Sequence, residues 1–352
     1  MLGFVGLGSV VETAWLPALN RLAPPGLRLL GVDLDPARNM PGVESVSSLA
    51  TMLSMPLQGV LVTATSSAHW QVLQQALDAG VSQIIVEKPI VATLDEAAAL
   101  AQRLADPAQA GRVLALDHWT ARGDGLQSLL TELPGGNPVR GVQDILRIDG
   151  YLQERSGFNE QGEPCALNFA TSEPDRRQLC YPDGVVLDTG THVLALLREW
   201  LVACRLPCGL SLRLLSMTDR LGQPIAAGDF TTAEGRAELD GVVGGIPLTL
   251  HLDKYAGPEG GRKGLVITGR SGWQLSVDRK GNSDVVVYEH QGRRHELQRP
   301  GAIYDYCLAA CLPDCLPGMQ VLGRNQRQAM TRRRLEEVTL LLKLQQSWRT
   351  LG

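Results

Sequence analysis

Short apolar runs alternate with helical stretches along the first third of the chain. The helical stretches include His69–Ala79 and Thr93–Ala105, and Thr93 with Glu96 has the pattern of a capping box at the start of the second one. Apolar runs between helices are typical of parallel strands that are buried on both faces. The predicted strands are Leu2–Val5, Leu27–Val32, Gly59–Thr63, Gln83–Val86 and Arg112–Leu116. They predict an α/β domain with a doubly wound parallel sheet over residues 1–122.

Longer β-like runs follow, and glycine-containing turns such as Asp240-Gly241 separate several of them. They predict a second, α+β domain over residues 123–352, with a large, mostly antiparallel open sheet. A leucine-rich helix at 325–348 could pack on either domain, and residues 154–180 have the low periodicity of a long loop or lid. The β-like runs are Pro138–Leu152, Leu210–Met217, Phe230–Leu239, Leu248–Tyr255, Gly264–Thr268, Trp273–Asp278 and Val285–His290.

Two glycines stand between the first predicted strand and the helix that follows it. Gly6 permits a sharp turn, and Gly8 lets the main chain approach a ligand closely. The helix start at Ser9 and Val10 offers main-chain N–H groups and the positive end of the helix dipole. This combination predicts a site for the pyrophosphate of a dinucleotide, although the fingerprint has glycine or alanine where this chain has Val11.

Asp33 ends the second predicted strand, where a dinucleotide-binding unit places the acid that binds the adenine ribose. A carboxylate there favours NAD, because it repels the 2′-phosphate of NADP. Arg38 is close enough in sequence to qualify that preference, so NADP stays an alternative. A turn at Asp33-Leu-Asp-Pro36 would also explain the acid without a ligand.

Composition excludes several classes of protein. The 352 residues are 44% hydrophobic and 20% charged, as in globular proteins, and a net charge of −4 gives no attraction to nucleic acid or anionic membranes. The chain enters its first strand at once and has no long apolar run, so we expect a cytoplasmic protein. Seven cysteines argue against a disulfide framework. Cys307, Cys311 and Cys315 are expected to be inert thiols, and no metal is predicted.

The order of motifs up to Pro89 resembles the Gfo/Idh/MocA oxidoreductases. The likeness rests on the glycine turn, on Asp33, on Thr65-Ser-Ser-Ala-His69 and on Ala79–Pro89 with its Glu-Lys-Pro ending. Members of that family oxidise or reduce sugars and polyols with NAD(P). The resemblance implies cofactor contacts in these segments, at Thr65, Ser66, His69, Glu87 and Lys88. Family members usually have Pro-Asn where this chain has Ser66-Ser67.

Lys88 stands at the end of a predicted strand, where open α/β sheets bind ligands. Hydride transfer from a secondary alcohol requires the loss of a proton from oxygen, and a positive group nearby stabilises the developing alkoxide. Lys88 is therefore a candidate catalytic and substrate-binding residue. The alternative is a surface lysine paired with Glu87.

Asp188 and His192 lie at a spacing that puts both on one side of a helix. A carboxylate one turn before an imidazole can orient the ring and stabilise its protonated form, as a general base requires. The segment resembles the Asp-x-Gly-x-His signature of the same family, with Ala195 in place of a further acid that many members have. In the alternative, Asp188 caps a helix and His192 fills its buried face.

Asp117–Arg122 is similar to a segment of glucose-6-phosphate dehydrogenases that lies close to the substrate phosphate. His118, Trp119 and Arg122 are therefore candidate substrate contacts, with Arg122 able to hold an anion through a bidentate fork. His118 and Trp119 could equally be packing residues. Tyr181 is a further candidate substrate residue, and weaker candidates are Arg176, Arg177, Lys254 and Tyr255.

Three hypotheses follow. The first is an NAD(P)-dependent oxidoreductase that transfers hydride between nicotinamide and a secondary alcohol or ketone of a sugar, polyol or cyclitol. The second is a phosphosugar dehydrogenase, and the third is a catalytically inactive, nucleotide-sensing regulator with the same fold. The resemblance also implies a homodimer or homotetramer that forms through the open sheet.

Overall fold

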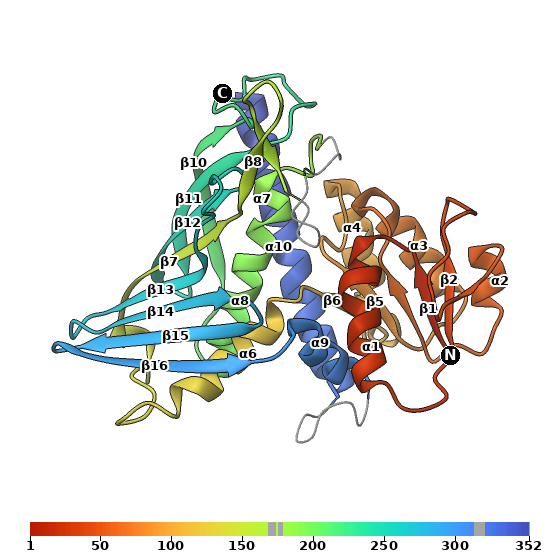
Figure 1. Cartoon of the computed structure of the whole chain (residues 1–352), viewed down its shortest axis with the longest axis horizontal. Coiled ribbons are helices and arrows are strands. Elements are labelled where there is room, and N and C mark those ends of the chain that lie inside the picture. Colours follow the sequence, from red (N-terminus) through yellow and green to blue (C-terminus); the bar gives the residue numbers. More distant parts are fainter. Residues whose placement is uncertain (168–173, 175–178, 313–320, 352) are drawn as a thin grey trace. The chain divides into compact units, whose positions relative to one another are not determined.

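The computed structural model describes residues 1–167, 174, 179–312 and 321–351. The chain divides into two compact units (Figure 1). The first contains Met1–Asp117 and Tyr304–Thr339, and the second contains His118–Ile303 and Leu340–Gly352. The chain thus returns to its first unit after building most of the second; the predicted boundary was after residue 122, with the helix at 325–348 free to pack on either domain.

The first unit contains a six-stranded parallel sheet, which confirms the predicted doubly wound architecture. Its order is β3-β2-β1-β4-β5-β6, so the chain starts near the middle and winds outward in both directions. Helices such as α1, α3 and α4 flank these strands in Figure 1. The strands are β1 Leu2–Val5, β2 Leu29–Val32, β3 Glu44–Ser45, β4 Gly59–Val62, β5 Ile84–Glu87 and β6 Val113–Leu116.

Local sequence explains most of the helices of this unit. Ser48 caps α2, and Thr93 with Glu96 forms the predicted capping box at the start of α4. The helices before the second unit are η1 Val11–Trp15, α1 Leu16–Leu22, α2 Leu49–Leu53, α3 Ser66–Asp78, α4 Leu94–Arg103 and α5 Pro107–Ala110. Two further helices, α9 Ile303–Cys311 and α10 Arg324–Leu351, come from the carboxyl-terminal part of the chain.

Helix α10 has residues in both units, since residues up to Thr339 belong to the first and those from Leu340 to the second. Cys307 and Cys311 are buried in α9 and form no disulfide bond, and Cys315 lies outside the described residues. No helix in the described part of the chain combines the length and the apolar character that a membrane span requires.

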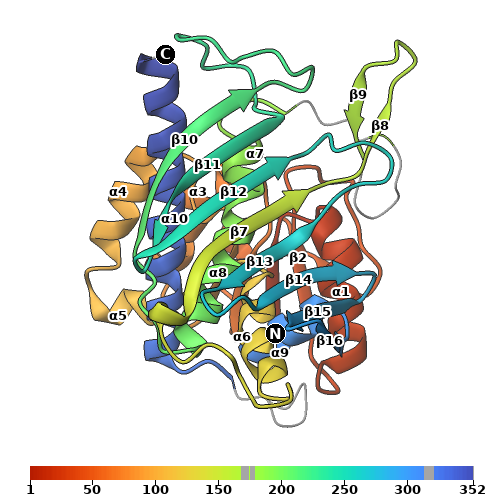
Figure 2. The same cartoon turned by 90° about the vertical axis from the view of Figure 1, so that its left-hand side faces the viewer.

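The second unit contains an eight-stranded sheet, and one face of it looks toward the viewer in Figure 2. Its order is β10-β11-β12-β7-β13-β14-β15-β16; β7 and β12 pair in parallel, and the other neighbours are antiparallel. This confirms the predicted mostly antiparallel open sheet. The strands are β7 Ile145–Gln153, β10 Leu210–Thr218, β11 Arg236–Val243, β12 Ile246–Asp253, β13 Lys263–Gly269, β14 Gln274–Lys280, β15 Ser283–His290 and β16 Arg293–Pro300.

The face of this sheet that is turned away from the viewer in Figure 2 is covered by helices α6 (Thr120–Leu130), α7 (Val185–Asp188) and α8 (Gly190–Ala203). Small residues permit their close packing. A Cβ on Gly150 of β7 would lie 2.5 Å from Val193 of α8, and one on Gly123 of α6 would lie 2.6 Å from the carbonyl oxygen of Leu196. The core of this unit therefore centres on α8.

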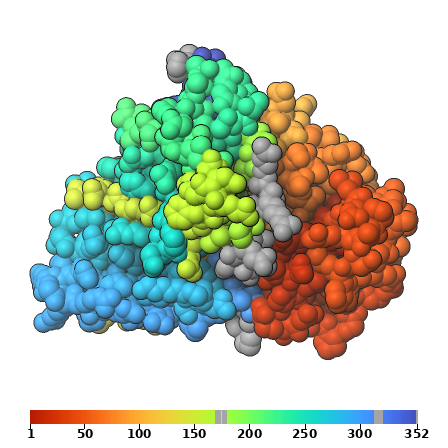
Figure 3. All heavy atoms as spheres, turned by 45° about the horizontal axis from the view of Figure 1, so that its top comes forward, coloured from red at the N-terminus to blue at the C-terminus, as the bar shows by residue number. Residues whose placement is uncertain are grey.

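The predicted loop at 154–180 contains an antiparallel hairpin made of β8 (Ser156–Phe158) and β9 (Pro164–Ala166). In Figure 3 the hairpin is the yellow-green group of spheres on the surface of the second unit. A short 3-10 helix, η2 (Val142–Asp144), precedes β7.

Candidate functional site

The glycine turn after β1 has room for a ligand at one of its two glycines. Gly6 has a φ of +92°, and a Cβ there would lie 2.4 Å from the Cα of Ala64, so the fold itself requires glycine. A Cβ on Gly8 would meet no atom within 4 Å. Packing within the described part of the protein therefore does not require glycine at position 8. A dinucleotide bound against the main chain would require it, because a side chain there would occupy the same space.

The helix that begins after this turn starts as a π-helix, η1. The N–H groups of Val11 and Glu12 both donate to the carbonyl oxygen of Gly8. Val11 is buried where the fingerprint has a smaller residue. A π-turn is wider than an α-turn, and this one begins at the branched side chain of Val11. Ser9 and Val10 are half-buried at the start of the helix, as a phosphate site requires.

Asp33 holds the glycine turn in place. Its carboxylate accepts hydrogen bonds from the main-chain N–H of Leu7, at 2.6 Å, and of Asp35, at 3.0 Å. Arg38 donates from Nε to the carbonyl oxygen of Leu7 at 2.7 Å. Asp33, which is predicted to bind the adenine ribose, and Arg38 are thus both hydrogen-bonded to the turn that would bind the pyrophosphate.

Thr63 follows β4 and was not among the predicted site residues. Its hydroxyl donates to the carbonyl oxygen of Gly6 at 2.6 Å and so joins two neighbouring strand ends. Thr65 is the exposed N-cap residue of α3, and Ser66 is the first residue of that helix. A residue that merely ends a predicted strand carries no sequence signal for such a bond.

His69 is buried, and both ring nitrogens face main-chain oxygens. Nδ1 lies 2.7 Å from the carbonyl oxygen of Pro89, and Nε2 lies 3.0 Å from that of Ala64. The ring therefore joins the start of α3 to the end of β5, which is a supporting position rather than the predicted direct cofactor contact. Lys88, which precedes Pro89, is half-buried, and the Lys88–Pro89 peptide bond is cis.

Glu87 points into the core of the first unit. Its Oε1 accepts hydrogen bonds from Trp15 Nε1, at 2.8 Å, and from the Tyr304 hydroxyl, at 3.1 Å. Burial raises the pKa of the Glu87 carboxyl to about 7, and Asp117 adds to the rise, while the two hydrogen bonds and the charge of Lys88 oppose it. This position does not fit the predicted direct contact with a cofactor.

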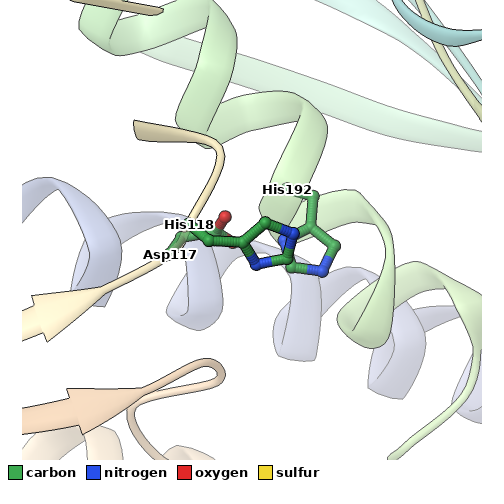
Figure 4. Close-up of side chains that lie close together, drawn as sticks. All are labelled: Asp117, His118 and His192. Atoms are coloured by element: carbon green, nitrogen blue, oxygen red, sulfur yellow. The ribbon is translucent and has the colours of Figure 1, made fainter. Parts of the chain in front are cut away.

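In the second unit, His192 lies in a group of rings. The rings of His118 and His192 lie together (Figure 4), with their centroids 4.5 Å apart. Trp119 stacks on His192 at 5.6 Å. Two predicted substrate residues are thus placed against the predicted general base. Histidine and aspartate are also common metal ligands, and His118 follows Asp117 in the chain, so the absence of a metal stays a prediction.

Arg122 has a different place from the one predicted. Its side chain is fully buried, and Nε donates to Asp284 Oδ1 at 2.7 Å. An Nη atom donates to the carbonyl oxygen of Lys263, and the guanidinium lies over the Trp119 ring. A buried arginine with these partners does not present a fork to a substrate phosphate, so the proposed anion pair of His118 and Arg122 loses one member.

Asp188 and His192 do not share one helix. Helix α7 ends at Asp188, Thr189 stands between, and His192 lies in the first turn of α8. Asp188 Oδ2 accepts a hydrogen bond from Lys254 Nζ at 2.7 Å. The same ammonium lies 3.1 Å from Glu154 Oε2.

Strand pairing explains this cluster of Glu154, Lys254 and Asp188. Glu154 follows β7 and Lys254 follows β12, and because these strands are parallel and in register, both residues leave the sheet at the same edge. Burial alone would lower the pKa of Lys254, but the carboxylates of Asp188 and Glu154 outweigh it and the net shift is upward. Glu154 was missed because the apolar runs do not reveal which strands pair.

Tyr181 packs by its ring within the second unit. Phe230 meets it edge to face at 5.8 Å, and the Arg349 guanidinium lies 4.6 Å from the ring centroid. Burial raises the pKa of its phenol. Arg176 and Arg177 lie outside the described residues.

A parallel sheet wound outward from β1, with an open glycine turn and an acid after β2, defines a nicotinamide-dinucleotide-binding Rossmann domain. Residues 3–115 match the oxidoreductase family described as Gfo/Idh/MocA with an NAD-binding Rossmann fold. Residues 3–115 are thus a Gfo/Idh/MocA-type NAD-binding Rossmann domain, which confirms the resemblance seen in the motifs of this part of the chain.

A curated relative matches only part of the chain. The protein YceM of Salmonella typhimurium is 32% identical over 106 residues, which are 27% of this chain and 32% of YceM. The chain therefore spans about a third of the length of this relative.

Solved structures match nearly the whole chain. The UDP-N-acetylglucosamine 3-dehydrogenase GnnA of Acidithiobacillus ferrooxidans has a TM-score of 0.60 and 16% identity, over 97% of this chain and 98% of GnnA. The 3-ketoreductase KijD10 of Actinomadura kijaniata, in a complex with TDP-benzene and NADP, has a TM-score of 0.61 and 16% identity, over 99% of this chain and 96% of KijD10. At these identities the likeness shows the fold.

Proposed function

We propose that this protein is an NAD(P)-dependent oxidoreductase that transfers hydride between nicotinamide and a secondary alcohol or ketone of a sugar, polyol or cyclitol. The observation that carries the proposal is the open space at Gly8, at the start of η1 in a Rossmann domain of an oxidoreductase family. The space supports dinucleotide binding, and the variant His192→Ala separates an enzyme from a regulator that only binds the nucleotide.

The residues of this chain divide the work as follows. The nicotinamide, when bound, supplies or accepts the hydride. Gly8 with the N–H groups of Ser9 and Val10 binds the pyrophosphate, and Asp33 binds the adenine ribose. In the oxidative direction His192 accepts the hydroxyl proton, and Lys88 stabilises negative charge on the reacting oxygen. In the reductive direction these roles reverse.

The cofactor we propose is NAD, because Asp33 repels a 2′-phosphate. Arg38, bound to the same turn as Asp33, offers a cation that would tolerate NADP.

Among substrates, nucleotide sugars belong to the range to be tested, since GnnA is named for one and KijD10 is a 3-ketoreductase. The phosphosugar alternative is weakened, because Arg122 is buried in an ion pair with Asp284. The resemblance supports a homodimer or homotetramer formed through the open sheet.

The first experiment is a titration of the purified protein with NADH and with NADPH, followed by a screen of sugars, polyols and nucleotide sugars for turnover. The diagnostic variant is Gly8→Val, which has room to fold but fills the space for the pyrophosphate. Gly209→Val is the matched control, because a Cβ on Gly209 also meets no atom within 4 Å.

We expect saturable binding that is tighter for NADH, an affinity at least about tenfold lower for Gly8→Val, and no change for Gly209→Val. Equal binding by the wild type and Gly8→Val would refute the proposed site. Turnover that His192→Ala abolishes, with NADH binding retained, would exclude the inactive regulator.

A further inference from the structure

Glu87 connects two parts of the first unit that belong to the proposed site. It is the last residue of β5 and directly precedes Lys88. Trp15, which donates to its carboxyl, is the last residue of η1, the helix that begins just after the glycine turn. One buried carboxyl therefore lies between the cofactor-binding helix and the strand end that carries the catalytic lysine.

The surroundings of Glu87 hold it in one position. Trp15 and Tyr304 both donate to the same oxygen, Oε1, and their rings meet edge to face with centroids 5.3 Å apart. Trp15 is completely buried and Tyr304 nearly so. Trp15 and Tyr304 can both donate to Oε1 whether or not Oε2 carries a proton. The geometry thus accommodates both protonation states of the carboxyl without a change of partners.

We propose that Glu87 is a positioning residue that couples occupancy of the dinucleotide site to the placement of Lys88, and that it takes up a proton when the cofactor binds. The inference rests on the proposed dinucleotide-binding function.

Charge supplies the reason for proton uptake. The titratable groups that face Glu87 are Asp117, which follows β6, Tyr304 on α9, and Lys88, which directly follows β5. The charge of Asp117 disfavours the ionised Glu87 carboxyl, and the charge of Lys88 favours it. Burial also disfavours the ionised form, and the net effect raises the pKa of Glu87 to about 7. The pyrophosphate of a dinucleotide adds negative charge at the start of η1. It therefore favours the protonated carboxyl, and binding should weaken as pH rises through neutrality.

The test measures NADH binding by isothermal titration calorimetry at several pH values. At pH 7 it is repeated in two buffers of different ionisation enthalpy, which counts the protons taken up. The wild type is compared with Glu87→Gln, which keeps an acceptor for Trp15 but cannot titrate, and with Glu87→Leu, which removes the acceptor. Glu44→Gln, at an exposed carboxylate on β3, is the control. Circular dichroism confirms that each variant is folded.

For the wild type and Glu44→Gln we expect uptake of a fraction of a proton and a roughly three- to tenfold loss of affinity between pH 6 and pH 8.5. Glu87→Gln should bind with no proton uptake and a flat pH profile. Glu87→Leu should bind several-fold more weakly at every pH, since two buried donors lose their acceptor.

Unchanged proton uptake in Glu87→Gln would overturn the proposal, and so would wild-type affinity in folded Glu87→Leu. Either result leaves the proposed function intact, because NADH still binds. Failure of the wild type to bind NADH or NADPH would instead refute the proposed function, and this inference with it.

Discussion

A buried arginine at the start of α6 shows how a residue type that suits one role can serve another. Arg122 has the fork that a phosphate site needs, yet its partners are Asp284, the carbonyl oxygen of Lys263 and the ring of Trp119. Asp284 also lies 3.3 Å from Arg279. Asp284 and Lys263 are far from Arg122 in sequence, so no local pattern distinguishes a substrate-binding arginine from one that holds the core together.

Arg122→Met should lower the free energy of unfolding by about 3–5 kcal/mol, because it leaves the buried Asp284 without its main partner. Urea denaturation measures the change, and adding Asp284→Leu should recover part of it. Arg213→Met removes an ion pair with Asp240 at the surface and should have no measurable effect. If Arg122→Met were as stable as the wild type, the pair would not be supporting the fold.

At the scale of elements, the strands and helices that sequence predicted best are those whose burial is complete. Each strand of the parallel sheet except β3 is a near-continuous apolar run. Strand β16 was missed because its residues, Arg293–Pro300, are mostly charged or polar. It forms an edge of the sheet, where charged side chains are common because they discourage pairing with other chains.

The break between α7 and α8 was missed for another reason. Periodicity continues through Thr189, but the helix does not, and Asp188 then meets Lys254 from a distant strand. Sequence could therefore name Asp188 and His192 as site residues, but it could not supply the ion pair that holds one of them.

Lys254→Met should destabilise the second unit by about 1–3 kcal/mol, because it leaves two carboxylates close together without their cation. The loss is moderate, since the side chains of Asp188 and Glu154 are 28% and 32% exposed and water solvates them in part. Thermal unfolding of Lys254→Met, Lys254→Met/Asp188→Asn and the wild type tests this. The double variant should be more stable than Lys254→Met alone, and the opposite order would contradict the argument.

At the scale of the whole molecule, the sequence predicted the fold of each unit but not that residues 304–339 belong to the first unit. Residues 304–339 belong with the first unit, although more than half of the chain separates them from its sheet. Contacts at such separation leave no trace in hydrophobic periodicity. Thr331 is an example: its hydroxyl accepts from the N–H of Ala115 and donates to the carbonyl oxygen of Val113, so it covers the main chain of the edge strand β6.

Glu87 gives overall stability a definite pH dependence. Its pKa is about 7 in the folded protein against 4.5 as the ordinary value, so its contribution is complete below pH 4.5 and is lost as pH rises through 7. The loss is on the order of 3 kcal/mol. Glu87→Gln should therefore be more stable than the wild type at pH 8, with a smaller difference at pH 5. Equal unfolding free energies at pH 8, measured in urea, would show that the carboxyl is not costly to ionise.

Thr331→Val should cost about 1–3 kcal/mol, because the N–H of Ala115 then lacks its buried acceptor. Hydrogen exchange should show faster exchange at Ala115 than in the wild type, while the amides of the central strand β1 keep their protection. Thr339→Val, in the same helix, is the control, since its hydroxyl bonds only within the helix, to the carbonyl oxygen of Leu335.

The division of the first unit between two distant segments has a consequence for biosynthesis. All six strands of its sheet leave the ribosome early, but Thr331, which completes the hydrogen bonds of β6, is made only after the entire second sheet. The amino-terminal third of the chain must therefore wait with an open strand edge while about two hundred residues are added. A nascent chain of this kind is a natural client for chaperones that shield exposed β-strands during translation.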